Sequence, residues 1–422
     1  MDQRQGMRTG IKSGELFCVS NSIMGSDRLF VATQHYPPDQ TTTAVYLGQI
    51  ARALTADREV IVLSGTAGSR SSGAENEPEV VEIRSRRSEK HALVRRAIGM
   101  CALAADMFLE ILRRVRRSDT VFCVTTPFTL PYTVVLAARL RGAATVLLIY
   151  DLYPEALEAA KFIKPTSISA RLLRFANSQL FRALDAIIVI GRDTPPLLTR
   201  YKGVAPAKIH FIPNWALIPI GYRELGPANP FRNVLRDKFV VGLSGNLGFT
   251  HDPRAVFEAA RLLAGNRDIH FLFSGWGVGW NKLNELAAAE QLHNMTMMAP
   301  VPDSELVDFL SAADVWVIPY RRHIAGVSIP SRLYNLLAVG RPIIVCSESH
   351  SEAAIVLGEE AIGWVVPPEE PALLAKAISD AATDRAGTTA KGRRAAVVAA
   401  KYSEEAATRR YREVIGTAGS RP

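Results

Sequence analysis

Apolar residues along this chain fall into two kinds of run. Short and nearly continuous runs, such as RLFVAT at residues 28–33 and VIVL at residues 60–63, have the length of buried strands. Between them, residues 44–54 carry apolar side chains at helical spacing. A strand, a loop, a helix and a second strand within about 35 residues predict a βαβ unit, and therefore a parallel sheet.

The same pattern continues to residue 215 and then restarts after a break. Residues 216–230 hold Pro219, Gly221, Gly226 and Pro227, and this density of breakers predicts a linker between domains. Before it, the further predicted strands are 120–124, 145–149, 186–190 and 209–212, with helices at 131–140 and 171–183 and another from residue 195. After it, the predicted strands are 239–244, 269–273, 295–298, 315–318 and 342–345, with helices at 252–263, 282–291, 304–312, 331–338 and 372–382.

This order of elements predicts an α/β protein with two Rossmann-like, doubly wound domains, at residues 28–215 and 231–399. A chain of 422 residues is long enough for two such cores. Residues 1–27 are polar and mixed, and we expect a loose tail there. Within residues 400–422, the helical pattern at 404–415 is expected to cross back to the first domain. Two facing doubly wound domains predict a ligand cleft between their strand ends.

Composition narrows the choice of partner and compartment. A net charge of +9 favours an anionic partner, such as a phosphorylated substrate, an anionic membrane face or nucleic acid. The four cysteines are scattered without a metal-binding spacing, which agrees with a reducing cytoplasm and predicts no metal site. The apolar stretch 97–112 is interrupted by Asp106 and Glu110 and is too short to span a bilayer, and we find no secretory signal in the first two dozen residues.

Seven segments then occur in a recognisable order. They are HYPPDQTTTAVYLGQIARAL at 35–54, DLYPEAL at 151–157, IPNW at 212–215, LSGNLG at 243–248, FLFSGWG at 271–277, AADVWVIPY at 312–320 and GVSIPSRLYNLLAVGRPIIV at 326–345. This ordered set resembles the family 4 glycosyltransferases, which are retaining enzymes of the GT-B fold often found in bacterial polysaccharide assembly. The resemblance implies a nucleotide-sugar donor, a glycan or lipid-linked acceptor, and no metal or other cofactor.

The segment 326–345 is the predicted donor site. Pro330 suits the first turn of a helix, where free backbone N–H groups and the helix dipole favour a diphosphate. Arg332 can add a charged bidentate contact, and we predict that it stabilises the leaving nucleoside diphosphate. The resemblance extends the donor side to two glycine-containing turns. The predicted donor-binding residues are Gly245, Asn246, Gly248, Gly275, Gly277, Val327, Ser328, Ser331, Arg332 and Asn335.

The acceptor side is predicted in the first domain. Asp151 and Glu155 follow a strand end, where the resemblance places acceptor contacts, and either carboxylate can receive the acceptor hydroxyl proton. The alternative is that Asp151 caps the next helix and Glu155 is a solvated residue of its first turn. Thr41, Thr42 and Thr43 stand where many relatives carry two glycines that touch phosphate, so hydroxyl contacts are expected there unless this is an ordinary polar loop. His35 and His323 are secondary candidates.

The chain departs from the family pattern at one place. The usual pair of glutamates, eight positions apart, falls on Val327 and Asn335. The amide oxygen of Asn335 can still accept a hydrogen bond from a ribose hydroxyl, but Val327 cannot replace a carboxylate beside the sugar. A catalytically weak relative that binds a nucleotide sugar as a partner protein is therefore the alternative function, with a nucleotide-sugar 2-epimerase as a third.

A basic segment flanks the apolar stretch. Arginines and one lysine surround it at Arg84, Arg86, Arg87, Lys90, Arg95, Arg96, Arg113, Arg114, Arg116 and Arg117. Such a cationic and partly apolar surface can dock on an anionic leaflet, so we expect peripheral contact with the inner face of the cell membrane; an ordinary helix with solvated flanks is the alternative. Nucleic acid is not expected, since no recognition module accompanies the arginines.

Overall fold

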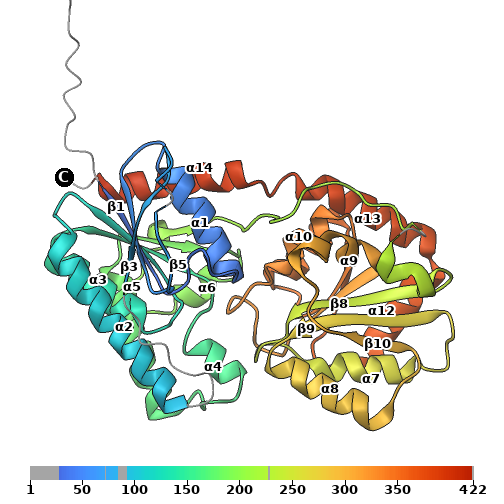
Figure 1. Ribbon diagram of the computed structural model, residues 1–422. Coiled ribbons are helices and arrows are strands. Elements are labelled where there is room, and N and C mark those ends of the chain that lie inside the picture. Colours follow the sequence, from blue (N-terminus) through green and yellow to red (C-terminus); the bar gives the residue numbers. More distant parts are fainter. Residues whose placement is uncertain (1–27, 72, 84–92, 227–228, 421–422) are drawn as a thin grey trace, which may run out of the picture.

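The computed structural model describes residues 28–71, 73–83, 93–226 and 229–420, and it contains two α/β domains joined by a linker (Figure 1). The first domain has a seven-stranded sheet in the order β3-β2-β1-β4-β5-β6-β7, and the second has a six-stranded sheet in the order β10-β9-β8-β11-β12-β13. Every strand pair is parallel. The predicted fold class, two doubly wound domains, is confirmed.

The first domain follows the predicted alternation of strands and helices. Its strands are β1 (Leu29–Thr33), β2 (Val60–Ser64), β3 (Glu79–Glu82), β4 (Thr120–Val124), β5 (Ala144–Ile149), β6 (Ala186–Val189) and β7 (Ile209–Phe211). Its helices are α1 (Thr42–Leu54), α2 (Leu93–Arg114), α3 (Leu130–Leu140), α4 (Glu155–Ala159), α5 (Ile168–Ala183) and α6 (Pro195–Leu198).

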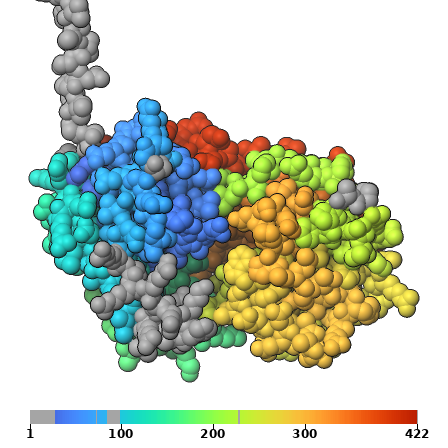
Figure 2. Space-filling view, viewed as in Figure 1, coloured from blue at the N-terminus to red at the C-terminus, as the bar shows by residue number. Residues whose placement is uncertain are grey.

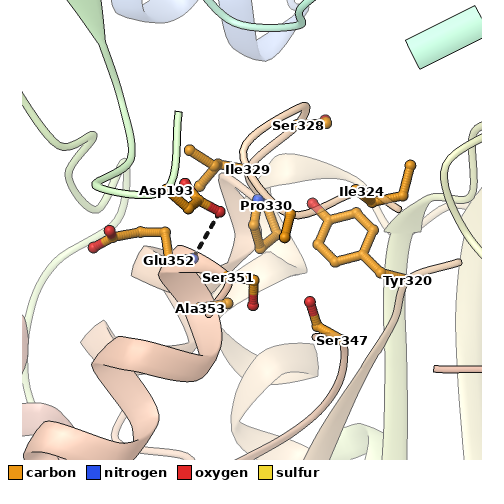
Figure 3. A pocket seen from close by; sticks show the side chains of 11 residues that line it. Asp193, Tyr320, Ile324, Ser328, Ile329, Pro330, Ser347, Ser351, Glu352 and Ala353 are labelled. Carbon is orange, nitrogen blue, oxygen red and sulfur yellow. Dashed lines mark hydrogen bonds between the residues drawn. The ribbon is translucent and has the colours of Figure 1, made fainter. Parts of the chain in front are cut away.

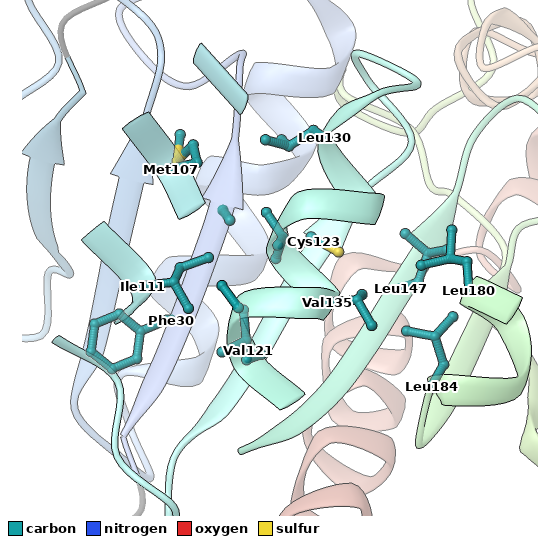
Figure 4. Packing of buried hydrophobic residues seen from close by; sticks show 14 of the residues in the cluster. Phe30, Met107, Ile111, Val121, Cys123, Leu130, Val135, Leu147, Leu180 and Leu184 are labelled. Carbon is teal, nitrogen blue, oxygen red and sulfur yellow. The ribbon is translucent and has the colours of Figure 1, made fainter. Parts of the chain in front are cut away.

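Both faces of this sheet are covered by apolar side chains. On one face, α2, α3 and α5 bury residues such as Met107, Val135 and Leu180 against Val121 and Leu147 of the strands (Figure 4). On the other face, α1 packs beside the last helix of the chain. The inner strands of this sheet, such as β1 and β5, are therefore buried on both faces, which is why they read as continuous apolar runs in the sequence.

The second domain repeats the arrangement of a parallel sheet covered by helices. Its strands are β8 (Phe239–Asn246), β9 (Ile269–Trp276), β10 (Met295–Met298), β11 (Val315–Pro319), β12 (Ile343–Cys346) and β13 (Gly363–Val366). Its helices are α7 (Pro253–Leu262), α8 (Val278–Glu290), α9 (Leu306–Ala312), α10 (Arg332–Ala338), α11 (Glu352–Glu360), α12 (Pro371–Thr383) and α13 (Arg385–Ala399). Two apolar clusters, one on each face of the sheet, form its core.

The last helix, α14 (Glu404–Gly419), returns to the first domain (Figure 1). It buries Tyr411, Val414 and Ile415 in the same cluster as Phe122 and Leu148 of the first sheet. Tyr411 and Phe122 are in edge-to-face contact, with ring centroids 6.1 Å apart. The crossover predicted for this helix is therefore present, and it packs α14 onto the first domain.

The sequence reading missed five elements, namely β3, α4, α11, β13 and α13. Strand β3 is an edge strand of four residues, EVVE, with its two glutamates exposed, so it has no continuous apolar run. Helix α13 packs through small residues, and Gly392 approaches the backbone carbonyl of Gly340 too closely for a Cβ to fit comfortably. An interface of glycine, alanine and threonine carries little of the periodicity on which the prediction relied.

Strand order also decides where a ligand can bind. In doubly wound sheets, ligands bind outside the carboxyl ends of the strands where the strand order reverses. These points fall between β1 and β4 in the first sheet and between β8 and β11 in the second. No helix in the described part of the chain combines the length and apolar character needed to cross a bilayer.

Candidate functional site

The candidate site lies where the carboxyl ends of the two sheets face each other, and a recess separates the two domains in the space-filling view (Figure 2). From the second domain, the loops that follow β8, β9 and β11 reach this edge. From the first domain, the segments that follow β5 and β6 reach it. The predicted donor residues therefore gather at the reversal point of the second sheet.

The two glycine-containing turns pack against each other as one unit. The N–H of Leu247 donates to the carbonyl of Trp276 at 2.8 Å, and the N–H of Gly279 donates to the carbonyl of Leu247 at 2.8 Å. Gly245 and Gly277 have φ values of +87° and +100°, which favour glycine. A Cβ on Gly275 would overlap the carbonyl oxygen of Gly245. The glycines thus allow two loops to meet without side chains between them, while Gly248 stays half-buried at the end of the first turn.

Arg332 joins this pair of turns to the start of helix α10. Its Nη1 donates to the carbonyl of Ser244 at 2.5 Å, and its Nη2 donates to the carbonyl of Asn246. Desolvation lowers the pKa of Arg332 to about 10, so the guanidinium stays charged at neutral pH. Two of its five N–H groups are used in these bonds, and the rest remain for an anionic ligand. Ser331, just before the helix, is half-buried and its hydroxyl makes no capping bond.

Asp151 of the first domain meets the loop that leads to this helix. Asp151 and Ser328 form an isolated antiparallel bridge, and the N–H of Leu152 donates to the carbonyl of Val327 at 2.9 Å. Burial raises the pKa of the Asp151 carboxyl, and a hydrogen bond with Ser328 opposes this rise. Asp151, predicted for the acceptor side, and Ser328, predicted for the donor side, are therefore in direct contact although they lie 177 residues apart (328 − 151).

The two positions that depart from the family pattern have different surroundings. Val327 is buried, with 4% of its surface exposed. The Oδ1 of Asn335 accepts a hydrogen bond from the N–H of Leu217 at 2.8 Å, so it fastens the linker to α10. The predicted bond to a ribose hydroxyl is thereby restricted to the second lone pair of that oxygen.

Glu155 is not brought together with Asp151. It opens helix α4 and accepts a hydrogen bond from the hydroxyl of Tyr201 at 2.7 Å, with Arg174 Nε at 3.9 Å. Burial raises the pKa of the Glu155 carboxyl, and the bond from Tyr201 opposes this. Glu155 is therefore neither a solvated residue nor a neighbour of the donor loop, and it braces the first domain.

The threonines and the secondary histidines make local contacts. Thr41 is the N-cap of α1 and its hydroxyl accepts from the N–H of Ala44 at 3.4 Å, while Thr42 and Thr43 begin the helix. Asp39 accepts from the N–H of Thr41 at 2.9 Å and bonds His35 Nδ1 at 2.6 Å. His323 is exposed, has φ +67°, and its N–H donates to Glu348.

The sequence reading missed His251, which follows the first glycine turn. It is 8% exposed and stacks in a tilted arrangement on Tyr320 with ring centroids 4.9 Å apart. Its Nδ1 lies 3.2 Å from the hydroxyl of Thr250, and its Nε2 is buried without a hydrogen-bond partner. Burial, followed by the charges of Arg332 and Arg321, lowers the pKa of His251 well below its ordinary value. A neutral imidazole therefore stands beside Arg332; its position six residues after Gly245 was the available signal.

A second missed residue is Asp193, which follows β6. It lies in a closely packed contact between the two domains, together with Tyr320, Ser328 and Glu352 (Figure 3). Its Oδ2 accepts from the N–H of Gly326 at 2.7 Å and from the N–H of Glu352 at 2.9 Å. It was missed because nothing near it in the sequence indicates a partner in the other domain.

The described residues include no group of three or more histidine, cysteine, aspartate or glutamate side chains that could hold a metal ion. At the recess, the carboxylate of Asp151, the guanidinium of Arg332 and the neutral imidazole of His251 stand beside backbone groups. The carboxylate can accept a proton, and the guanidinium can stabilise a developing phosphate charge.

Comparison with known proteins agrees with this arrangement. Residues 41–215 match the model of the glycosyl transferase 4-like domain, and residues 228–401 match the model of glycosyl transferases group 1. A probable glycosyltransferase WbjE from Pseudomonas aeruginosa is 28% identical over 363 residues, covering 84% of this chain and 89% of the relative. The putative colanic acid biosynthesis glycosyl transferase WcaI from Escherichia coli K12 is 28% identical over 269 residues, covering 61% and 65%.

Among solved structures, the Anabaena protein HepE in complex with UDP-glucose superposes with a TM-score of 0.68 at 15% identity. The match covers 92% of this chain and 99% of HepE. At this identity the likeness shows the fold alone, and it extends across both domains and the crossing helix.

Proposed function

This chain belongs to the family 4 glycosyltransferases, enzymes of the GT-B fold that transfer glycosyl groups, and on that premise we propose that it moves a sugar from a nucleotide-sugar donor to a polysaccharide precursor or a lipid-linked acceptor. The observation that carries the proposal is the contact between Asp151 and Ser328. It puts a carboxylate of the first domain against the loop that precedes Arg332. A catalytically weak binding relative is not favoured, since both domains match glycosyl transferase models.

In the proposed reaction, the bond between the anomeric carbon and the diphosphate oxygen breaks as the acceptor oxygen bonds to that carbon. Arg332 stabilises the negative charge that develops on the leaving nucleoside diphosphate. Asp151 receives the proton of the acceptor hydroxyl, and its raised pKa brings it nearer to neutral pH, where a general base works best. We propose retention of the anomeric configuration, which is the outcome that the family resemblance implies.

We also propose that the reaction needs no metal ion. Arg332 and the N–H groups beside it supply positive charge where a cation would otherwise neutralise the diphosphate. His251 would add a neutral hydrogen-bond donor, since its Nε2 has no protein partner and its lowered pKa keeps it uncharged. HepE was solved in complex with UDP-glucose, and uridine nucleotides are therefore the first to test for this chain.

Peripheral contact with an anionic membrane through the segment from Arg84 to Arg117 completes the proposal, with the enzyme on the cytoplasmic side. Arg84, Arg86, Arg87 and Lys90 lie outside the described residues. Support comes from α2, where Ile98 and Leu109 are 63% and 46% exposed, and from the arginines at its end. Exposed apolar side chains continue on the neighbouring helices at Leu136, Leu140, Ile168, Leu172 and Phe175. Sedimentation with vesicles of anionic lipid, compared with zwitterionic vesicles, tests this contact.

The test of the main proposal is thermal stabilisation by a panel of nucleotides and nucleotide sugars, with and without EDTA. A ligand at ten times its Kd stabilises the native state by about 1.4 kcal/mol. We expect a shift in Tm with one nucleotide sugar, unchanged by EDTA, followed by turnover of that donor with a glycan or lipid-linked acceptor. Binding without turnover would support the partner-protein alternative, and a Tm that no nucleotide moves would contradict the proposed function.

A further inference from the structure

One side chain of the first domain holds two separate backbone segments of the second. Asp193 follows β6 and only 8% of its surface is exposed. Its Oδ2 accepts the N–H of Gly326 at 2.7 Å. It also accepts the N–H of Glu352, the first residue of α11, at 2.9 Å (Figure 3). A single carboxylate oxygen therefore joins the start of the donor loop, residues 326–330, to the start of a helix.

Arg192, the residue before Asp193, also binds helix α11. The backbone N–H of Arg192 donates to the carboxylate of Glu352 at 2.7 Å, and its Nε donates to the same group at 3.0 Å. Glu352 is 1% exposed, and the Nη1 of Arg192 also reaches Glu359 at 2.8 Å. The end of β6 is thus bound to α11 through charged hydrogen bonds, which are stronger than neutral ones.

The fit around the donor loop leaves little freedom. Gly326 has φ +74°, and a Cβ there would overlap the carbonyl of Asp193. The next two residues of the loop also contact the first domain. The N–H of Leu152 donates to the carbonyl of Val327, and Asp151 forms an isolated bridge with Ser328. The first three residues of the donor loop therefore contact the first domain, although the donor-binding residues that follow the loop, Ser331 and Arg332, belong to the second domain.

We propose that Asp193 is a positioning residue that orders the donor loop for nucleotide-sugar binding, so that the donor site is complete only while the two domains are in contact. This role rests on the proposed function. Without the carboxylate, the N–H groups of Gly326 and Glu352 lose their shared acceptor, and the loop gains backbone freedom that a bound donor must remove. The expected cost therefore falls on donor binding.

The test compares Asp193→Ala and Asp193→Asn with Asp119→Ala. Asp119 is a matched control, because it is 2% exposed in the same domain and accepts the N–H of Arg116 at 2.6 Å. It precedes β4, so it lies at the amino ends of the parallel strands, whereas Asp193 follows β6 at their carboxyl ends. The measurements are the KM for the nucleotide sugar that stabilises the wild type most, kcat at saturating donor, Tm, and hydrogen exchange of peptides covering residues 324–330 and 351–357.

We expect Asp193→Ala to raise the donor KM at least tenfold, to change kcat less, and to speed exchange in both peptides. Asp193→Asn keeps one acceptor oxygen, so its KM and exchange should fall between those of the wild type and the alanine variant. Asp119→Ala should lower Tm and leave the donor KM unchanged. A donor KM in Asp193→Ala equal to that of the wild type would overturn the role of Asp193 alone. A wild-type chain that binds no nucleotide sugar would overturn the proposed function and this role with it.

Discussion

The strand ends of both domains face the same recess, but different contacts hold together the loops on its two sides. In the second domain, the turns at Gly245 and Gly275 interlock, and Arg332 binds the carbonyls of Ser244 and Asn246. In the first domain, the loop before α1 is joined to the loop after β2 through the hydroxyl of Thr66, which accepts from the N–H of Tyr36 at 3.0 Å. At Thr41 the same loop makes short-range contacts, with Asp39 and Ala44. The donor edge is thus braced by a guanidinium and by interlocking turns, whereas the loops of the first domain are joined through single threonine hydroxyls.

This difference has a functional meaning for a glycosyltransferase. A nucleoside diphosphate presents the same charges in every catalytic cycle, so a preorganised edge lowers the cost of ordering on binding. The first domain adds single residues, Asp151 and Asp193, that touch the donor loop. The comparison therefore predicts large effects from changes on the braced donor edge, and smaller effects along the loop before α1.

The largest effect is expected for Arg332→Ala. The substitution removes the guanidinium that is proposed to stabilise the leaving diphosphate and also frees two carbonyls of the glycine turn, so kcat/KM should fall by about 10²–10³-fold. Arg332→Lys should recover only part of this loss, because an ammonium cannot bind in a bidentate way. Arg322→Ala is the control, since Arg322 is an exposed arginine paired with Glu369 and Glu370. Steady-state kinetics within twofold of the wild type for Arg332→Ala would contradict the donor-site assignment.

A second large effect distinguishes the two carboxylates of the first domain. Asp151→Asn removes the proposed proton acceptor, and kcat should fall by about 10²-fold. Burial raises the pKa of Asp151, so the ionised form costs stability above that pKa; Asp151→Asn should therefore raise Tm at pH 8, with a gain that shrinks as the pH falls and the wild-type carboxyl becomes protonated. Scanning calorimetry across pH measures this.

Glu155→Gln is the companion variant. Its carboxylate accepts from Tyr201 and lies near Arg174 rather than at the donor loop. We expect kcat to change by less than about fivefold, well below the effect of losing a general base. An equal loss of kcat in Glu155→Gln and Asp151→Asn would remove the distinction between them.

A smaller effect is expected for His251→Ala. Loss of one neutral hydrogen-bond donor to the diphosphate should raise the donor KM by about tenfold, and His251→Gln, which retains an N–H donor, should recover part of it. Because burial and two arginines depress the pKa of His251, its protonation should not contribute to the pH dependence of kcat/KM between about pH 6 and 8. A limb of the pH profile in that range that disappears in His251→Gln would show that the imidazole titrates there.

The smallest effect is expected for Thr41→Ala. The hydroxyl caps α1, so the free energy of unfolding should fall by about 1 kcal/mol. The acceptor KM should change less than threefold, because the contacts seen for Thr41 are local. Urea titration and acceptor kinetics measure both quantities, and an acceptor KM raised tenfold would instead assign the loop a direct contact with the substrate.

Much of the fold could be predicted because buried parallel strands leave continuous apolar runs in the sequence, as in FVVGLS at the start of β8. The donor residues were predictable as a set because Gly245 and Arg332 lie in short segments that resemble the family's motifs. Their mutual contact was not, since 86 residues (332 − 246) separate Arg332 from the Asn246 carbonyl that it binds. Glu155 was predicted as an acceptor contact together with Asp151, and nothing in the sequence indicated that its carboxylate accepts a hydrogen bond from Tyr201.

By itself, the sequence determined the alternation of strands and helices and the residue types available at the strand ends, because each of these depends on local pattern. Tertiary structure alone decided which of them meet. His251 is desolvated because it packs against Tyr320, and Asp193 accepts hydrogen bonds from Gly326 and Glu352 of the other domain. Desolvation and hydrogen bonding over long sequence separations depend on how the two sheets face each other, and no local pattern encodes that geometry.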